Sequence, residues 1–393
     1  MASSLRPGPR GPGIFAKLNA WWGAYALGQV LVIGAVLALF VFLGSNTVNA
    51  MAAIGIKPGF DFLFQSANFE IGESLISYSA GDTYGRALLA GLINTAKVAL
   101  LGCLLATVLG VVLGIARLSG NLLLAGLVRW YIEIVRNTPL LLQLFFWSAT
   151  LKALPGPRQA FSLLDAIFLT NRGINVPAVL LGPLSGPSVA FAAAVLAIGV
   201  AAAAILWRKG KRGSAVTAAL FGVFLSVTAL PLGGTVLALE TPALSGFNIR
   251  GGWSLSPEFA VLLIGLVVKF SASIAEIVRA GIESVSRGQW EAARSLGLHN
   301  GQIMRLVVLP QALRVITPMT TSIYLDLTKD SSLAVAIGYP DLVSVANTTA
   351  NTTGQALESL AVLVVVFLSI NLSISALMNV YNRRVALRGE FVR

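Results

Sequence analysis

Residues 87–116 read ALLAGLINTAKVALLGCLLATVLGVVLGIA, an apolar run with a single charged side chain, Lys97. A helix needs about 20 apolar residues to cross a bilayer core of about 30 Å, and this run is long enough. Its residues do not alternate at period two, which argues against a strand of a membrane barrel. The stretch therefore predicts a transmembrane helix and, with it, a helical membrane fold.

The composition of the whole chain agrees with a membrane protein. Hydrophobic residues make up 56% of the 393 residues and charged residues 11%, with a mean hydropathy of +0.81. A soluble domain usually carries about a quarter charged residues. We therefore expect an all-α integral membrane protein with about eight transmembrane helices. The predicted helices are roughly Trp21–Leu43, Ala87–Ala116, Leu122–Leu151, Val189–Trp207, Ser214–Val236, Glu258–Ala280, Val315–Ile337 and Leu357–Tyr381.

Basic residues are distributed unevenly among the segments that connect these helices. With the N-terminus in the cytoplasm, the inner segments hold basic clusters at 6–17, 208–212, 279–314 and 383–393. The outer segments hold only Lys57, Arg86, Lys152, Arg158, Arg172 and Arg250. Cytoplasmic loops carry an excess of Lys and Arg, so the formal charge of +12 requires no nucleic acid, and both termini are expected in the cytoplasm.

Three features break the regular succession of helices. The first apolar run exceeds the 7 to 15 residues, approximately, of a signal-peptide core, so a retained anchor helix is expected. Residues 45–86 form a long outer segment, and residues 152–187 contain Pro-Gly clusters that predict an outer loop or re-entrant structure. The two Ala-rich helices around residues 208–212 are interpreted as a peripheral hairpin.

The most informative polar stretch joins the sixth and seventh predicted helices. Residues 283–310 read ESVSRGQWEAARSLGLHNGQIMRLVVLP, which is too polar for lipid. Good helix formers at 289–296 precede Gly297, which can end a helix in a left-handed turn, and a second helical stretch should run to Pro310. Two short helices with a glycine hinge would form a docking element for a soluble partner. An ordinary amphipathic loop is the alternative.

The spacing of this loop resembles the EAA loop of ABC importer permeases. The residues that carry the resemblance are Glu291, Ala292, Ala293, Gly297, Leu309 and Pro310. The resemblance implies that they form a coupling helix seated in a groove of an ATPase.

Other segments are similar to the polar amino-acid uptake family of these permeases. They are GLINT at 91–95, RLS at 117–119, VRNTPL at 135–140 and KDSSL at 329–333. The additional outer segment and the extra hairpin resemble the general L-amino-acid type (AapQ/BztB-like).

This resemblance implies a type I ABC importer-like permease core with an extra helical hairpin, in the bacterial inner membrane. The implied divisions are an N-tail, first helix and periplasmic segment at 1–86, a first core segment at 87–151, inserted periplasmic segments and the hairpin at 152–255, a second core segment with the coupling loop at 256–382, and a basic cytoplasmic tail at 383–393.

Polar residues within the predicted helices are candidates for a substrate pathway. A charge at the bilayer centre costs at least about 2.5 kcal/mol, so it should face protein or water. Glu133 could pair with Arg136, Lys329 could neutralise Asp326, and Thr138-Pro139 should break the third helix. Pairing only among themselves or with a partner subunit is an alternative of nearly equal weight. The candidates are Arg136, Thr138, Pro139, Gln143, Asp326, Lys329, Asp330, Ser331 and Ser332.

Such a mixture of groups suits a zwitterionic substrate. The carboxylate of an amino acid needs a cation or hydroxyl donors, and its ammonium needs carboxylates or carbonyls. Lys269 and Glu276 share a face of the sixth helix, but Lys269 is interpreted as structural.

An enzymatic site lacks the necessary residues. The single histidine, His299, falls in the coupling loop, so neither a Ser-His-Asp triad nor a multi-histidine metal site is expected. No phosphate-binding GxxxxGK[ST] motif occurs. We expect no catalytic residue, metal or cofactor in this chain, and ATP and Mg²⁺ on a partner ATPase.

The function implied by the resemblance is that of a permease subunit of an ATP-driven amino-acid importer. Its implied partners are a second homologous permease, an ABC ATPase dimer and a periplasmic amino-acid-binding protein. The alternative is an ion-gradient-driven secondary amino-acid transporter, which also uses broken helices but needs no EAA loop. A channel would need a polar stripe through several helices, and no convincing one is found.

Overall fold

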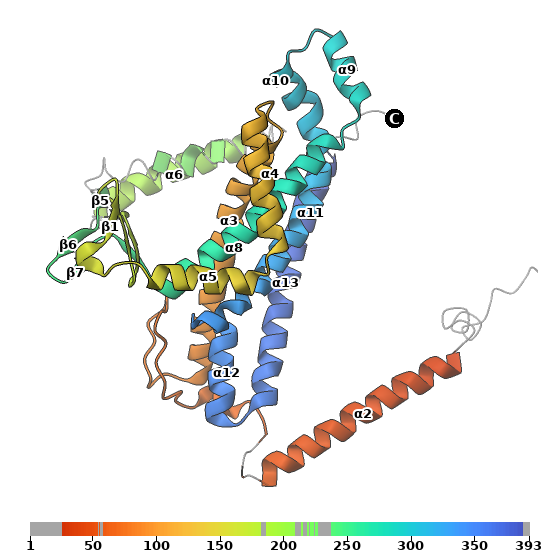
Figure 1. Ribbon diagram of the computed structural model, residues 1–393. Coiled ribbons are helices and arrows are strands. Elements are labelled where there is room, and N and C mark those ends of the chain that lie inside the picture. The colour runs from red at the N-terminus through yellow and green to blue at the C-terminus, as the bar shows by residue number, and fades with distance from the viewer. Residues whose placement is uncertain are drawn as a thin grey trace, which may run out of the picture.

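A computed structural model of the chain describes residues 26–53, 55, 58–181, 186–208 and 237–387, with a few positions between 214 and 226. Long helices dominate it (Figure 1). Five helical segments within these residues are long and apolar enough to cross a membrane, which confirms the helical membrane fold. They are Gly28–Ala53, Tyr84–Arg117, Pro257–Glu283, Asn300–Ile337 and Ala356–Asn382.

Two of the predicted helices fall partly outside the described residues. The first is described only from residue 26, as α2 (Ala26–Ala53), which projects away from the bundle in Figure 1. The fourth corresponds to α6 (Gly186–Arg208). The fifth, Ser214–Val236, lies mostly outside the described residues.

The centre of the bundle is the contact between α3 (Tyr84–Arg117) and α8 (Pro257–Glu283). Glycines of α3 allow the two backbones to approach closely, since a Cβ added at Gly110 would lie 2.7 Å from the Cβ of Ile274. Small residues serve this purpose between membrane helices, where no hydrophobic effect drives association. Helices α11 (Leu309–Asp330), α12 (Leu342–Thr353) and α13 (Ala356–Leu387) complete the bundle.

The third predicted helix is broken at Thr138-Pro139, as expected. It consists of α4 (Leu122–Asn137) and α5 (Leu140–Lys152), which run in different directions in Figure 1. Pro139 has no N–H to donate, and the residue before a proline is pushed to extended backbone. Thr138 accordingly has φ −94° and ψ 127°.

The expectation of a loop or re-entrant structure at 152–187 missed the short strands that form within residues 161–181 and pair with strands within residues 237–255. A sheet with the order β1-β2-β3-β8 is antiparallel throughout, and β4 pairs with β5 and β6 with β7. Strands of three or four residues are too short for alternation to be recognised in the sequence. Their bounds are β1 Phe161–Leu163, β2 Ile167–Thr170, β3 Gly173–Val176, β4 Ala178–Leu181, β5 Leu237–Glu240, β6 Ala243–Ser245, β7 Asn248–Arg250 and β8 Trp253–Leu255; the 3-10 turn η2 (Pro157–Gln159) precedes β1.

The outer segment at 58–83 folds back on the bundle. It begins with the 3-10 turn η1 (Asp61–Phe64) and packs aromatic rings against the start of α3. The ring centroids of Phe62 and Phe69 lie 6.0 and 6.1 Å from that of Tyr84. Side chains of α12 and α13 close this second apolar core. The segment is therefore integral to the folded bundle.

Candidate functional site

The break between α4 and α5 is capped by one side chain from α8 and one from α5. The ammonium of Lys269, on α8, donates to the carbonyl oxygens of Val135, Arg136 and Thr138 at 3.3, 2.9 and 3.1 Å. The amide nitrogen of Gln143 donates to the carbonyls of Val135 and Thr138, each at 3.0 Å. A cation at a helix C-terminus also offsets the negative end of the helix dipole. The carbonyls of Val135, Arg136 and Thr138 at the break are thus occupied.

Several predicted pathway residues gather around this capped break. Arg136 is exposed and Asp330 is half-buried, and both charges act on Lys269. The amide oxygen of Gln143 is buried and has no hydrogen-bond partner among the described residues. Pro139 is exposed where α5 begins. The structure therefore brings a cation, a carboxylate and an amide together at a helix break.

The two predicted ion pairs are wrong. Glu133 pairs with Arg129, one turn earlier on α4, at 2.7 Å, so Arg136 is left at the break. Asp326 and Lys329 are both exposed and form no ion pair with each other in the described residues of the chain. Side chains three residues apart on a helix can meet, but exposed ions gain little from pairing.

The hydroxyl groups after α11 do not all face the break. Ser331, at the start of the 3-10 segment η5 (Ser331–Ile337), is buried and donates to the carbonyl of Thr328 at 2.7 Å. Ser332 and Lys329 line a shallow groove against α13. Of the polar residues at 326–332, Asp330 is the one whose charge acts on Lys269.

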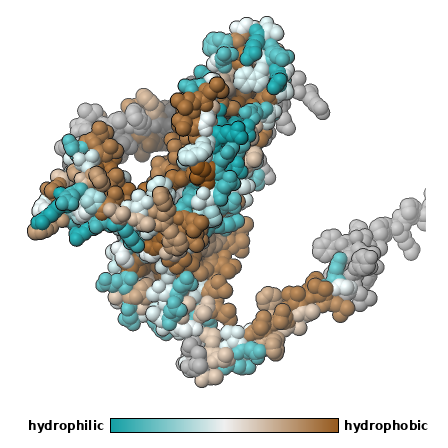
Figure 2. Space-filling view, in the orientation of Figure 1, coloured by the Kyte–Doolittle hydropathy of each residue, from teal (hydrophilic) through white to brown (hydrophobic). Residues whose placement is uncertain are grey.

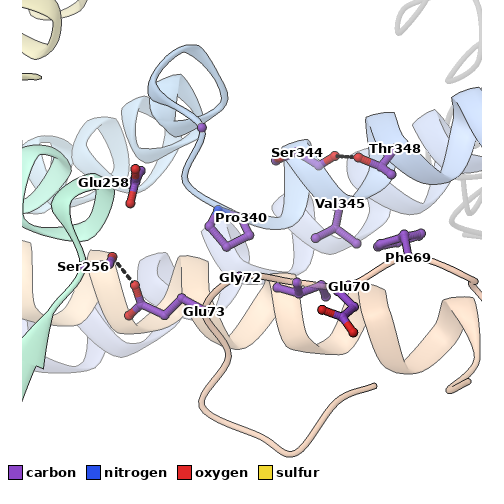
Figure 3. A pocket seen from close by; sticks show the side chains of 12 residues that line it. Phe69, Glu70, Gly72, Glu73, Ser256, Glu258, Pro340, Ser344, Val345 and Thr348 are labelled. Carbon is purple, nitrogen blue, oxygen red and sulfur yellow. Dashed lines mark hydrogen bonds between the residues drawn. The ribbon is translucent and has the colours of Figure 1, made fainter. Parts of the chain in front are cut away.

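A pocket of about 460 Å³ lies between the outer segment, the start of α8 and the turn before α12 (Figure 3). Three carboxylates line it, those of Glu70, Glu73 and Glu258. Figure 3 shows Glu73 hydrogen-bonded to Ser256, with Pro340 facing them from the turn.

Glu73 and Asn94 together join the outer segment, α3, the start of α8 and the turn before α12 beside this pocket. Its carboxylate pairs with Lys97 of α3 at 2.6 Å and accepts a hydrogen bond from Ser256 at the start of α8. The amide nitrogen of Asn94 donates to the Glu73 carbonyl at 2.7 Å and to the Pro340 carbonyl at 2.9 Å. Sequence reasoning missed Glu73, although the uncompensated Lys97 in an apolar run was a signal that an anion lies nearby.

Asp341 caps α12 just beyond the turn. Its carboxylate accepts from the Ser344 N–H at 2.8 Å, and its second oxygen is buried without a partner among the described residues. Burial raises the pKa of Asp341 to about 6, against hydrogen bonds from backbone N–H groups that lower it. The N–H of Leu342 donates to the hydroxyl of Thr95 at 3.0 Å, which fixes the turn to α3.

Charged residues also link α3 and α8 at the opposite end of the bundle. Glu276 pairs with Arg117 at 3.3 Å and with Arg279 at 2.5 Å, and Arg279 also binds Glu283. The side chains of Arg117, Glu276 and Arg279 are all less than one quarter exposed. Since they share partners, this network holds the C-terminal ends of α3 and α8 together.

The loop at 283–310 forms a two-helix projection at one end of the bundle (Figure 1). Helix α9 (Arg287–Ser295) ends before Gly297, whose φ is +76°, so the predicted glycine turn is confirmed. Ala293 is buried, whereas Glu291 and Ala292 are exposed. The predicted element thus presents a charged side chain outward from a short anchored helix.

The second half of this loop differs from the expectation. Helix α10 (Asn300–Ile303) continues through a π-helical turn, Met304–Val308, into α11, so the helix does not stop at Pro310. Leu309 and Pro310 instead occupy the first positions of α11, both exposed. Pro310 has no N–H to donate inside this continuous helix, and the π-helical turn directly before it is the irregularity in the helical hydrogen-bond pattern at this point.

Hydrophilic surface coincides with this projection. Figure 2 shows hydrophilic residues gathered at the end that carries α9 and α10, continuing in a band beside α4. Hydrophobic residues cover much of the rest of the bundle in that view. The projection is therefore suited to water or a soluble partner, and the bundle to lipid.

The comparisons with known proteins agree on one kind of membrane protein. The family model described as "binding-protein-dependent transport system inner membrane component" matches residues 106–387. The amino-acid ABC transporter permease protein YhdX of Escherichia coli strain K12 is 49% identical, over 94% of this chain and 95% of YhdX.

Two further relatives match over nearly their whole length. The general L-amino acid transport system permease protein AapQ of Rhizobium johnstonii is 41% identical, over 91% of each chain. The glutamate/glutamine/aspartate/asparagine transport system permease protein BztB of Rhodobacter capsulatus is 38% identical, over 92% of this chain and 93% of BztB. The similarity to these relatives thus includes the inserted segments at 152–255.

Proposed function

Since the chain belongs to the family of binding-protein-dependent transport system inner membrane components, we propose that it is the permease subunit of an ATP-driven importer for amino acids. The observation that carries the proposal is the exposed helix α9 with its glycine turn at one end of a membrane bundle. Full-length similarity to amino-acid permeases supports the substrate class.

The α9 projection is the docking element for an ABC ATPase dimer. Glu291 faces outward from α9, and Gly297 sets the direction of the chain that follows. Leu309 and Pro310 begin the membrane helix α11, so movement of α9 is passed to the bundle through a continuous helical segment. ATP and Mg²⁺ bind to the ATPase, and this chain contributes no catalytic residue.

The substrate pathway passes the break between α4 and α5. Arg136 presents a cation for the carboxylate of an amino acid, and Asp330 presents an anion for its ammonium. Lys269 and Gln143 hold the break in place between them. Three charged residues are exposed at membrane depth, namely Arg136, Asp326 and Lys329. A second, homologous permease covers them and completes the pathway.

This assignment orients the chain in the inner membrane. The α9 end faces the cytoplasm with both termini, and the pocket beside Glu73 faces the periplasm, where an amino-acid-binding protein delivers substrate. The basic clusters at 279–314 then lie on the cytoplasmic side, in agreement with the positive-inside rule.

The test is purification of the chain from its native membrane in mild detergent, with identification of copurifying proteins and assay of ATP hydrolysis. We expect an ATPase and a second permease, and ATP hydrolysis stimulated by a binding protein loaded with its amino acid. Recovery of the chain alone, with amino-acid uptake in proteoliposomes driven by an ion gradient and indifferent to ATP, would contradict the proposal.

A further inference from the structure

Three charged residues follow one another along α8 at intervals of seven, namely Lys269, Glu276 and Glu283. Residues seven apart lie on one face of a helix, and each interval spans about 10 Å. The row therefore leads from the helix break, where Lys269 caps α4, to the end of α8, where the chain enters the α9 projection. Figure 2 shows a hydrophilic band beside α4 that continues to the same end of the bundle.

Glu276 is the centre of this row and binds two arginines. Its carboxylate lies 3.3 Å from a guanidinium nitrogen of Arg117, at the end of α3, and 2.5 Å from one of Arg279. The side chains of all three are no more than 24% exposed. Arg279 also binds Glu283, which is 52% exposed and is the last residue of α8. Arg279 is thus shared between a carboxylate inside the bundle and a carboxylate at the root of the α9 projection.

Close packing already joins α3 and α8 on both sides of Glu276. A Cβ added at Gly110 would lie 2.7 Å from the Cβ of Ile274, and one added at Gly114 would lie 2.8 Å from the Cβ of Val278. Partly buried ions lose hydration energy that their attraction offsets only in part, so such pairs add little to a contact that packing provides. Ionisable residues within membrane helices are rare and mark functional pathways. A role beyond helix association is therefore expected of these ions.

A further cation, Arg136, acts on Glu276 from the end of α4. Its backbone carbonyl accepts from Lys269 at 2.9 Å, and its charge acts on both Lys269 and Glu276. Arg136 is exposed and forms no ion pair within the described part of the chain. Its guanidinium is therefore close enough to Glu276 to influence it and is still available to a second anion. Like charges repel, so Arg136 also opposes the approach of other cations to Glu276.

We infer that Glu276 is a positioning residue that transmits substrate binding at Arg136 to the root of the α9 projection, which rests on the function proposed above. A substrate carboxylate that binds Arg136 neutralises the cation that competes with Arg279 for Glu276. Arg279 then binds Glu276 more tightly and Glu283 less tightly. Because α9 follows directly after Glu283, the release of this carboxylate changes how the projection is held against the bundle.

The test measures ATP hydrolysis by the whole transporter in nanodiscs, with and without the binding protein loaded with its amino acid. Glu276→Gln keeps the size of the side chain and removes its charge, so we expect the ratio of stimulated to unstimulated hydrolysis to fall several-fold. Glu133→Gln is the control, because it removes a carboxylate from an exposed ion pair with Arg129 and should keep the parent ratio. An unchanged ratio in Glu276→Gln would overturn the inference.

A double-mutant cycle separates transmission from a purely structural role. Arg136→Gln should also lower the stimulation ratio, measured at saturating amino acid. In the Glu276→Gln background it should lower the ratio no further, because the two residues act in the same pathway. Two independent reductions that multiply in the double variant would show that Glu276 only supports the fold, and would overturn the inference.

An exposed member of the network gives a second test if Glu276→Gln fails to assemble. Glu283→Gln removes the outer partner of Arg279 without leaving a buried charge unpaired, so the melting temperature should stay within a few degrees of the parent. The stimulation ratio should still fall several-fold. A purified parent without an ATPase would refute the proposed function, whereas a stimulated parent with an equally stimulated Glu283→Gln would refute this inference alone.

Discussion

The ammonium of Lys97 lies 2.6 Å from a carboxylate oxygen of Glu73, and the same ammonium lies 3.9 Å from the centroid of the Phe259 ring. Lys97 is the only charged residue in its long apolar run, and Glu73 belongs to the outer segment 24 residues earlier in the chain. Their side chains are 20% and 23% exposed. The ion pair therefore closes a loop of the outer segment onto α3 in a partly desolvated place.

A double-mutant cycle should measure this contact. Glu73→Gln and Lys97→Met should each lower the thermal stability of the purified chain, because each leaves a partly buried charge without its partner. The double variant should be more stable than the sum of the single effects predicts. We expect an interaction energy of roughly 1 kcal/mol, a small value because solvent screens this partly exposed pair. Strict additivity in thermal melts would show that the pair contributes nothing.

Loss of the Glu73–Lys97 ion pair should also make the outer segment at 58–83 open more often. Limited proteolysis of Glu73→Gln in detergent should cut within residues 58–83 several-fold faster than in the parent chain, because local opening tracks the loss of tertiary contacts. Glu70→Gln is a suitable control, since Glu70 is exposed and lines the same pocket.

The cap on the helix break supplies a second prediction. Lys269→Met should remove three hydrogen bonds, two of them to partly buried carbonyls, and should destabilise the chain by about 2 to 3 kcal/mol. Lys269→Arg, which keeps the charge, should lose less. Equal melting temperatures for Lys269→Met and the parent chain would mean that the carbonyls find other partners.

Much of the fold could be predicted because lipid imposes simple rules. Length and hydropathy located the run at 87–116, the proline located the break at Thr138-Pro139, and a glycine after good helix formers located the turn at Gly297. These features depend on local sequence alone. The division of the chain into residues 1–86, 152–255 and the two core segments stays a prediction.

The remaining features depend on residues far apart in the chain. Strand β3 pairs with β8 across about 80 residues that include α6, and each strand is too short to have its own signature. The sequence indicates a structural role for Lys269, but its partners at 135–138 become identifiable only when α4 and α8 lie side by side in the fold. The assumed pair of Glu133 with Arg136 was wrong because Arg129 offered an equally suitable competitor on the other side.

Substrate recognition can be separated from folding at the break. Asp330→Asn and Arg136→Gln should raise the KM for amino-acid uptake by about 10-fold or more, because each removes a charge-assisted contact worth about 1.5 to 3 kcal/mol. Arg129→Gln, on the same helix, loses an exposed ion pair and should leave KM unchanged. Uptake kinetics in proteoliposomes with the whole transporter give the comparison. An unchanged KM in both charge variants would show that the substrate pathway does not pass the break between α4 and α5.

The buried cap of α12 predicts a pH dependence of stability. Burial raises the pKa of Asp341 from 3.8 to about 6, so the folded chain holds this proton more tightly than the unfolded chain. The stabilisation from this group is therefore complete below about pH 4 and is lost as the pH rises through about 6. Asp341→Asn keeps an N-cap side chain and carries no charge.

Thermal melts of Asp341→Asn and the parent chain should diverge with pH. The parent should lose stability relative to the variant between about pH 4 and 6.5, by roughly 2 to 3 kcal/mol in total. A constant difference across this range would show that the carboxylate has the same pKa in the folded and unfolded chains.

A substitution in the glycine turn after α9 is the most direct test of the coupling between ATP hydrolysis and transport. Gly297 has a φ of +76°, which costs a residue with a side chain about 1 kcal/mol, and no atom lies within 4 Å of a Cβ placed there. Gly297→Ala should therefore change the direction of the chain after α9 without disturbing the membrane bundle. We expect binding-protein-stimulated uptake to fall several-fold while the melting temperature of the bundle stays within a few degrees of the parent.

Gly126→Ala is the matched control for this variant. Gly126 lies within α4, outside the loop, with helical backbone and the same open space around it, so alanine there should preserve or slightly increase stability. Glu291→Lys reverses the charge that α9 presents and should leave ATP hydrolysis running without uptake. Normal uptake in both Gly297→Ala and Glu291→Lys, at normal expression, would mean that the ATPase engages another surface of the chain.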